Sequence, residues 1–155
     1  MFKEEVISRI KVFEGYSEQP YVCPAGKWTV GFGYNYQDRG FTTEYLTEIL
    51  QKGMTADIAD RLLADDVCRV VLECEKTFAW YKALDDVRRA TITDMCYQLG
   101  LRGLMQFKKM LSAIERKDYA AAATEAKNSR WYTQSGRRSG INVKQLESGK
   151  FQTYK

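Results

Sequence analysis

The chain has 155 residues, about the length of one ordinary domain, and its 45% hydrophobic and 13% aromatic residues are enough to build a substantial core. The formal net charge is +4, and the absence of histidine argues against a Ser-His or Cys-His catalytic pair. Four cysteines without a C-x-x-C pair argue against a structural zinc site, so we expect no metal and no cofactor.

The N-terminal segment carries charges where a signal peptide has its apolar run, and no stretch of about 20 apolar residues predicts a membrane span. The first predicted element is an amphipathic helix that ends at about Glu14, because Gly15 is a natural C-terminal stop. The C-terminal end of a helix carries partial negative charge, which disfavours a charged carboxylate beside it. A general acid must hold a proton, so a glutamate at this position suits that role. Its apolar face is made of Phe2, Val6, Ile7, Ile10 and Phe13.

A hairpin follows, with the turn "PAGK" leading into the strand "KWTVGFGY". Period-two alternation puts Lys27, Thr29, Gly31 and Gly33 on one face of this strand, and that face is almost bare. Either a ligand or another chain segment lies close against it, or the glycines relieve a tightly packed bend. The opposite face carries Trp28, Val30, Phe32 and Tyr34.

The rest of the chain reads as helices. Thr42 or Thr43 caps a helix that ends at Gly53, and Thr55 caps a long helix that runs to about Glu75. A second core helix stops at Gly100, and shorter helices are predicted around 104–115 and 119–127. The basic and aromatic segment "NSRWYTQSGRRSG" comes last, without a predicted element.

This pattern predicts an α+β fold that is mostly helical, with a small β-hairpin lobe and a larger helical lobe joined by a long helix. We expect one domain over residues 1–155, with the N-terminal helix and β lobe in about 1–53 and the connecting helix and helical lobe in about 55–155. A cleft between two lobes is the default site. Cys68, Cys74 and Cys96 fall on helical faces with apolar neighbours and are expected to be buried.

Five motifs follow one another along the chain: "FEG" at the end of the first helix, "KWTVGFGY", "LDDVRRATITDMCYQLG", "FKKML" and "AKNSRWYTQSGRR". In this order they resemble the phage-type lysozymes, where a T-x-G-x-G-H strand stands in the place of "KWTVGFGY". The resemblance covers nearly the whole chain and implies the lysozyme-like fold. It also implies a muramidase that hydrolyses the β-1,4 bond between N-acetylmuramic acid and N-acetylglucosamine in bacterial peptidoglycan.

The resemblance also implies roles for individual residues. Glu14 matches the family's catalytic acid, Thr29 its water-positioning threonine, and Arg138 the arginine that contacts the catalytic glutamate. Tyr97 and Gln98 match cleft positions, and we add Gly31, Gly33 and Tyr34 of the strand to the substrate-binding set. Arg130 and Trp131 match residues that hold the C-terminal part together.

Two positions depart from the family. Cys23 stands where the family usually has an aspartate, and Tyr34 stands where it often has a histidine. An inverting glycosidase needs a base beside its acid, and a thiol with a pKa near 8.5 is a poor substitute for a permanent charge. Cys23 is therefore a thiolate base or nucleophile, or it holds the water together with Thr29, or another carboxylate acts, of which Glu18 and Asp38 are nearest.

Two other activities stay open. A lytic transglycosylase needs a single catalytic carboxyl and gives anhydro products, and an inactive lysozyme fold would bind the wall or a partner. A nucleic-acid surface on the basic C-terminal segment would explain the charge but not the glycine strand, so no nucleic acid is expected. We expect a monomeric phage endolysin for host lysis that accumulates in the bacterial cytoplasm and reaches the wall through a holin-like, membrane-permeabilising protein.

Overall fold

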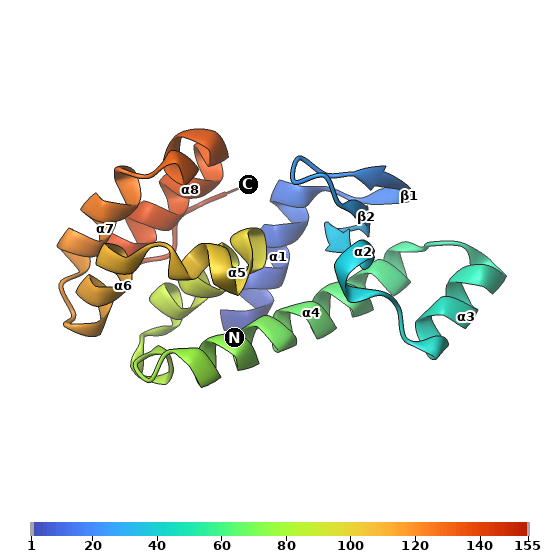
Figure 1. Cartoon of the computed structure of the whole chain (residues 1–155), viewed down its shortest axis with the longest axis horizontal. Coiled ribbons are helices and arrows are strands. Elements are labelled where there is room, and N and C mark those ends of the chain that lie inside the picture. Colours follow the sequence, from blue (N-terminus) through green and yellow to red (C-terminus); the bar gives the residue numbers. More distant parts are fainter. Residues whose placement is uncertain (1, 155) are drawn as a thin grey trace. The chain divides into compact units, whose positions relative to one another are not determined.

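The computed structural model describes residues 2–154 and confirms an α+β fold that is mostly helical (Figure 1). The N-terminal elements are α1 (Phe2–Glu14), β1 (Ser17–Val22), β2 (Trp28–Gly31), β3 (Tyr34–Asn35), α2 (Tyr36–Arg39) and α3 (Thr43–Lys52). The later elements are α4 (Ala56–Thr77), the 3-10 helix η1 (Tyr81–Ala83), α5 (Asp86–Met105), α6 (Lys108–Glu115), α7 (Tyr119–Lys127) and α8 (Arg130–Ser148).

The chain forms two compact units. One consists of residues 7–66, and the other combines the beginning of the chain, up to Val6, with the part from Val67 onward. The border therefore lies inside α4, whereas the sequence predicted a lobe border near residue 54. That residues 1–155 act as one lysozyme-like domain stays a prediction.

The unit of residues 7–66 holds an antiparallel sheet with the strand order β1-β2-β3. The prediction of one extended strand through Tyr34 is wrong, because β2 ends at Gly31 and a tight turn leads into β3. Gly31 has a φ of +67° and Gly33 a φ of +75°, values that residues with a side chain rarely adopt. The alternation of apolar residues in the sequence continues through this turn and therefore did not indicate it.

The core of this unit forms between β2 and the first turns of α4. Val30 of β2 packs with residues of α4 and its preceding loop, and aromatic side chains from the sheet, α2 and α3 cover the cluster. The buried members are Val30, Met54, Ile58, Ala59 and Leu62. Burial of apolar side chains of this size stabilises a fold by about 1.5–3 kcal/mol each. The same contacts fix the sheet against α4, and with it the residues that follow Val30.

The helix predictions are largely confirmed. α1 ends at Glu14, and the side chain of Thr42 caps α3 by accepting from the Tyr45 N–H. α5 loses helical geometry at Gly100, the predicted stop, before it continues to Met105. α8 was not predicted, because its first half has few apolar residues and it bends at Gly136.

The prediction that Cys68 is buried is wrong. Cys74 and Cys96 are buried, but Cys68 is exposed. The core face of α4 includes Val67, Val70 and Val71, and a residue one position after Val67 is rotated by about 100° away from that face.

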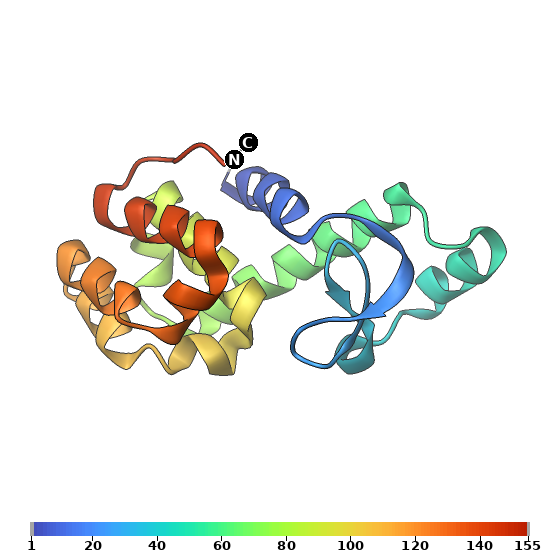
Figure 2. The ribbon, with the colours of Figure 1, turned by 90° about the horizontal axis from the view of Figure 1, so that it is seen from above.

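In the other unit α6 packs on α7, and α7 and α5 pack on α8; the two views agree that α6, α7 and α8 lie side by side (Figure 1 and Figure 2). A buried ion pair links α5 to α8. Arg138 donates through Nη2 to Asp94 at 2.8 Å and through Nε at 3.2 Å, and the Asn142 side chain donates to the same carboxylate at 2.8 Å. All three side chains are buried, so these contacts replace the water that the charges lose.

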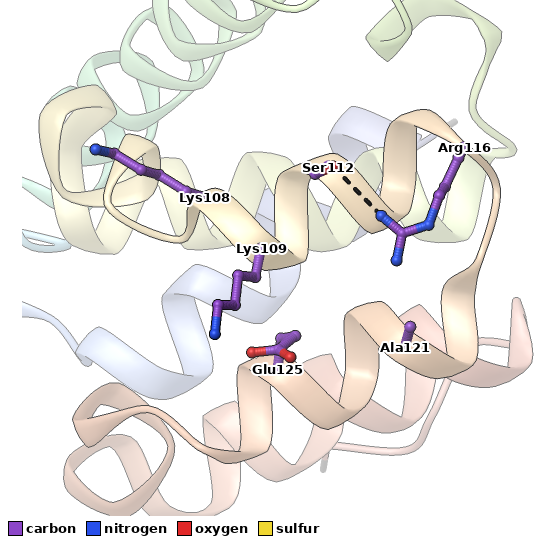
Figure 3. Close-up of a pocket in the computed structure, with 6 residues that line it drawn as sticks. All are labelled: Lys108, Lys109, Ser112, Arg116, Ala121 and Glu125. Carbon is purple, nitrogen blue, oxygen red and sulfur yellow. Dashed lines mark hydrogen bonds between the residues drawn. The ribbon is translucent and has the colours of Figure 1, made fainter.

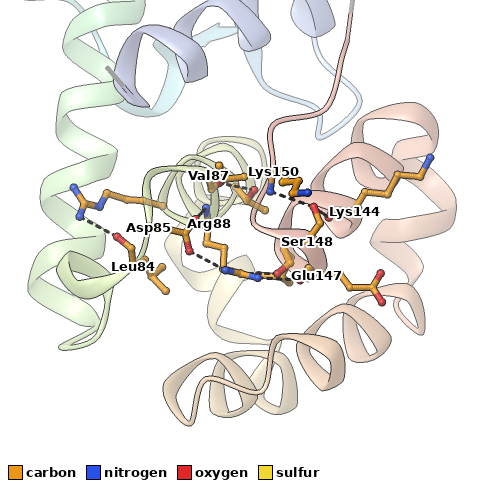
Figure 4. A network of polar contacts seen from close by, with 11 residues as sticks. Leu84, Asp85, Val87, Arg88, Lys144, Glu147, Ser148 and Lys150 are labelled. Carbon is orange, nitrogen blue, oxygen red and sulfur yellow. Dashed lines mark hydrogen bonds and ion pairs between the residues drawn. The ribbon is translucent and has the colours of Figure 1, made fainter.

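Arg88 makes a second connection between α5 and α8. Its guanidinium donates to the carbonyl oxygens of Leu146 and Glu147 at 2.7 and 2.9 Å, and it also pairs with Asp85 at 2.9 Å (Figure 4). The last carbonyls of a helix have no partner within the helix and carry partial negative charge. Arg88 therefore caps the C-terminal end of α8 by donating hydrogen bonds to these carbonyl groups.

Removal of the Asp94 carboxylate is expected to destabilise this unit strongly. Asp94→Ala leaves the Arg138 charge buried without its main partner, which typically costs about 3–5 kcal/mol. Urea unfolding followed by circular dichroism measures the loss, and Glu115→Ala, an exposed position on α6, should change stability by less than about 0.5 kcal/mol. Equal effects of the two substitutions would contradict a supporting role for the ion pair.

Candidate active site

Glu14 is the last residue of α1, and its half-buried side chain lies against the β2–β3 turn. A Cβ atom placed on Gly33 would lie 3.0 Å from Cγ, Cδ and Oε2 of Glu14, which is tighter than nine in ten real Cβ contacts. A side chain at position 33 would therefore shift the Glu14 carboxyl group by a few tenths of an ångström. The turn needs glycine here for its φ and also for the space that Glu14 occupies.

The second glycine of the strand has another neighbour. A Cβ on Gly31 would lie 3.1 Å from the Cβ of Ala59 in α4. Of the two explanations for the bare strand, the packed bend applies at Gly31, where α4 covers the residue. At Gly33 the close neighbour is the predicted catalytic acid itself.

Cys23 lies in the tight turn between β1 and β2. Its backbone N–H donates to the Lys27 carbonyl at 2.9 Å, and the Gly26 N–H donates to the Cys23 carbonyl at 2.8 Å. The half-buried thiol accepts hydrogen bonds from the N–H groups of Lys27 and Ala25 and from the Thr29 hydroxyl. Backbone N–H groups that point at one atom favour a negative charge on it.

These donors change the acidity of the thiol. Partial burial raises the pKa of Cys23, but the hydrogen bonds from the Lys27 N–H, the Thr29 hydroxyl and the Ala25 N–H outweigh it. The pKa of Cys23 is therefore lowered from its ordinary value, with backbone and hydroxyl donors as the cause. The donors that lower this pKa are neutral groups of the turn.

Thr29 is buried beside Cys23 and serves two acceptors. Its hydroxyl donates to the Lys27 carbonyl at 2.9 Å, and it is also a hydrogen-bond donor to the Cys23 sulfur. A hydroxyl has one proton, so these two bonds alternate. Ionisation of Cys23 favours the bond to sulfur, because a charged acceptor makes the stronger hydrogen bond.

The two spare carboxylates differ from Glu14. Asp38 is exposed, and it accepts from Lys27 Nζ at 3.1 Å and from the Asn35 side chain at 3.0 Å. These bonds, with Lys27 first, lower the pKa of Asp38. Glu18 is an exposed residue of β1. Neither has the contact with the glycine turn that distinguishes Glu14.

Tyr34, which was predicted to bind substrate, contacts other residues of its own unit. Its hydroxyl donates to the Gly40 carbonyl at 2.8 Å, and its ring stacks on Phe41 with a centroid distance of 5.6 Å. The substrate-binding roles of Gly31, Gly33 and Tyr34 stay predictions.

The remaining predicted site residues belong to the other unit. Gln98 donates to Ser135 at 2.9 Å and accepts from the Trp131 indole at 2.9 Å, so its amide fixes the beginning of α8. Trp131 is buried and packs, as expected. Arg138 is held by Asp94, and Tyr97 is half-buried. The predicted roles of Tyr97, Gln98 and Arg138 in substrate binding stay predictions.

The sequence analysis missed Tyr21. It is the direct partner of Thr29 in the β1–β2 ladder, so the two side chains lie on one face of the hairpin. Partial burial is the main reason that the pKa of Tyr21 is raised, and the negative charges of Glu14 and Cys23 raise it further. The available signal was its position two residues before Cys23, since alternate strand residues share a face.

The unit that begins at Val67 also has a pocket of about 300 Å³ between α6 and α7 (Figure 3). Lys108, Lys109 and Arg116 make its lining basic, with Glu125 as the opposing charge. Over residues 2–154 no group of three or more acidic, cysteine or histidine side chains is arranged to hold a metal ion. Within the same range, no helix has the length and apolar character needed to span a bilayer.

Comparison with known proteins gives relatives over nearly the whole chain. A sequence profile described as phage lysozyme matches residues 11–147. The chain is 29% identical over 162 residues to probable T4-type lysozyme 1 of Dictyostelium discoideum, covering 94% of this chain and 95% of that protein. It is 40% identical over 75 residues to probable T4-type lysozyme 2 of the same organism, covering 48% of this chain and 44% of that protein.

The matched range includes Glu14, the β2–β3 turn and the Cys23 turn, together with all the helices from α2 to α7. The α+β architecture and the order of motifs agree with this match. The chain therefore belongs to the phage lysozyme family and is a lysozyme-type glycoside hydrolase of peptidoglycan.

Proposed function

We propose that the chain is a muramidase that hydrolyses the β-1,4 bond between N-acetylmuramic acid and N-acetylglucosamine. The observation that carries this proposal is the placement of Glu14 against Gly33, on the unit that also holds Cys23 and Thr29. Glu14 gives its proton to the glycosidic oxygen as the bond breaks, which is the role of the acid in a two-group glycosidase.

The second group is the Cys23 thiolate. In this mechanism the thiolate accepts a proton from a water molecule while that water attacks the anomeric carbon, and the Thr29 hydroxyl orients the same water. What supports this role is the turn, which lowers the pKa of the thiol and so increases the fraction that is ionised near neutral pH. The departure from aspartate is thereby compensated by hydrogen bonds.

A lytic transglycosylase is the second candidate activity, since the position of the usual carboxylate holds a thiol. Such an enzyme needs Glu14 alone, because a hydroxyl of the muramic acid attacks its own anomeric carbon. The two reactions differ in the mass of their products. Hydrolysis adds one water to each cleaved bond, and the transglycosylase product is an anhydro sugar.

The biological setting is proposed from the family resemblance. We infer a phage endolysin, acting as a monomer, that accumulates in the bacterial cytoplasm and is released to the wall by a holin-like protein. The two relatives named above come from a slime mould, so related chains also occur outside phages. Expression in a bacterium with and without a pore-forming partner tests this setting: lysis without the partner would contradict it.

The first prediction concerns the acid. Glu14→Gln keeps size and polarity but cannot donate a carboxylic proton, so activity on purified peptidoglycan should fall by at least about 100-fold. Mass spectrometry of the released muropeptides measures the rate and also identifies the product. Glu18→Gln is the control and should keep full activity. Retained activity in Glu14→Gln, with the fold intact by circular dichroism, would contradict the assignment.

The second prediction concerns the space beside Glu14. Gly33→Ala should reduce activity far more than stability, because the added Cβ collides with the catalytic carboxyl. Gly53→Ala is the matched control, since Gly53 has a φ of +77° and nothing within 4 Å of an added Cβ. Both should lose about 1–2 kcal/mol in urea unfolding through backbone strain, while Gly53→Ala should keep its activity. Equal activities would show that the contact with Glu14 is dispensable.

The third prediction concerns the thiol. Alkylation of Cys23 by iodoacetamide should rise with pH and reach half its maximal rate below the roughly 8.5 of an ordinary thiol, because its pKa is lowered in the fold. Thr29→Val removes one donor and should move this midpoint upward. Peptide mass spectrometry separates Cys23 from the exposed Cys68, and Thr47→Val on α3 is the control.

The proposed hydrolysis needs the Cys23 thiolate and the protonated Glu14 carboxyl at the same time, so substitution of Cys23 tests the base more directly than a pH profile of activity. Cys23→Ser should lower activity by about 100-fold or more, because a serine hydroxyl is not ionised near neutral pH. Undiminished hydrolysis in Cys23→Ser would exclude the sulfur as the base. Anhydro products would replace the water mechanism by transglycosylation.

A further inference from the structure

The β1–β2 hairpin has one face turned outward and one turned inward. Val22 and Trp28 are direct partners and are 53% and 48% exposed, which marks the outer face. Tyr21 and Thr29 are the neighbouring pair, so alternation puts both on the inner face. Thr29 is only 3% exposed, and Tyr21 is half-buried. The Tyr21 phenol thus belongs to the same surface as the water-orienting hydroxyl.

The Tyr21 hydroxyl differs from three other tyrosine hydroxyls of this unit. Tyr16, Tyr34 and Tyr45 each donate to a protein acceptor, respectively the Met54 carbonyl, the Gly40 carbonyl and the Asp65 carboxylate. Within residues 2–154 no protein group forms a hydrogen bond with the Tyr21 hydroxyl. A half-buried donor without a protein acceptor is available to a ligand.

The charges around Tyr21 limit what this ligand group can be. Partial burial raises the pKa of Tyr21, and the negative charges of Glu14 and Cys23 raise it further, so the hydroxyl keeps its proton. An anionic ligand group beside Glu14 and Cys23 would be repelled. The fitting acceptor is therefore neutral, and in an N-acetylated glycan the carbonyl oxygen of the acetamido group is a strong neutral acceptor.

We propose that Tyr21 is a substrate-positioning residue, whose hydroxyl donates a hydrogen bond to the acetamido carbonyl of the sugar bound beside Glu14 and Thr29. This inference rests on the proposed muramidase function. It makes Tyr21 a specificity residue, because a glycan without its acetyl group has no carbonyl oxygen to accept this hydrogen bond. A site built to bond one group discriminates against the analogue that lacks it.

The test compares wild type and Tyr21→Phe on N-acetylated peptidoglycan and on the same peptidoglycan after chemical de-N-acetylation. The wild type should prefer the acetylated wall. Tyr21→Phe should lose about tenfold in kcat/KM on the acetylated wall, the effect of one neutral hydrogen bond, with most of the change in KM. On the de-N-acetylated wall the two proteins should differ little.

Tyr45→Phe is the matched control, since it removes a hydroxyl from α3 of the same unit. Binding of an N-acetylglucosamine tetramer to Glu14→Gln and to Glu14→Gln with Tyr21→Phe measures the same contact without turnover. The double variant should bind about tenfold more weakly, and a glucosamine tetramer should not distinguish the two.

The outcomes separate the two proposals. If the wild type cleaves the wall but Tyr21→Phe has the same preference for acetylated substrate, the role of Tyr21 is overturned and the muramidase stands. If Tyr21→Phe loses activity equally on both walls and shifts the pH profile, Tyr21 acts on Glu14 or Cys23 and not on the acetyl group. If the wild type cleaves neither wall, the proposed function falls and the role of Tyr21 with it.

Discussion

The close approach of the β2–β3 turn to the end of α1 is the constraint on which the candidate site depends. It requires glycine at Gly33 for two separate reasons, a left-handed φ and the volume of the Glu14 side chain. Val30 anchors the strand in the core with α4, so the turn cannot retreat from Glu14 without loss of that packing. The position of the Glu14 carboxyl thereby depends on the hydrophobic core of its unit and not on an exposed loop.

In the other unit, buried polar contacts join two of the helices in addition to apolar packing. Asp94, Arg138 and Asn142 are all buried, and Gln145 donates to Thr91 in the same helix pair. Such groups stabilise a fold only when every partner is present. This unit therefore combines an apolar core with a row of buried hydrogen bonds between α5 and α8.

The amino-acid sequence predicted the long helices well, since apolar periodicity, caps such as Thr42 and stops such as Gly53 are local signals. It did not reveal the turn after Gly31, because the alternation of apolar residues continues through Phe32 and Tyr34. α8 was not predicted, because its first half has few apolar residues and the helix bends at Gly136. Within the candidate site, the pattern and the family resemblance predicted roles for Glu14 and Thr29, whereas two of the donors around Cys23 are backbone N–H groups, which no residue type predicts.

The turn around Cys23 has a consequence for how this position can vary. The groups that favour a negative charge there are the N–H groups of Lys27 and Ala25 and one hydroxyl, and the backbone donors are independent of the side chain at position 23. These backbone donors would therefore remain if another side chain stood at this position. The preference for a negative charge belongs to the main chain of the hairpin as much as to the residue that carries the charge.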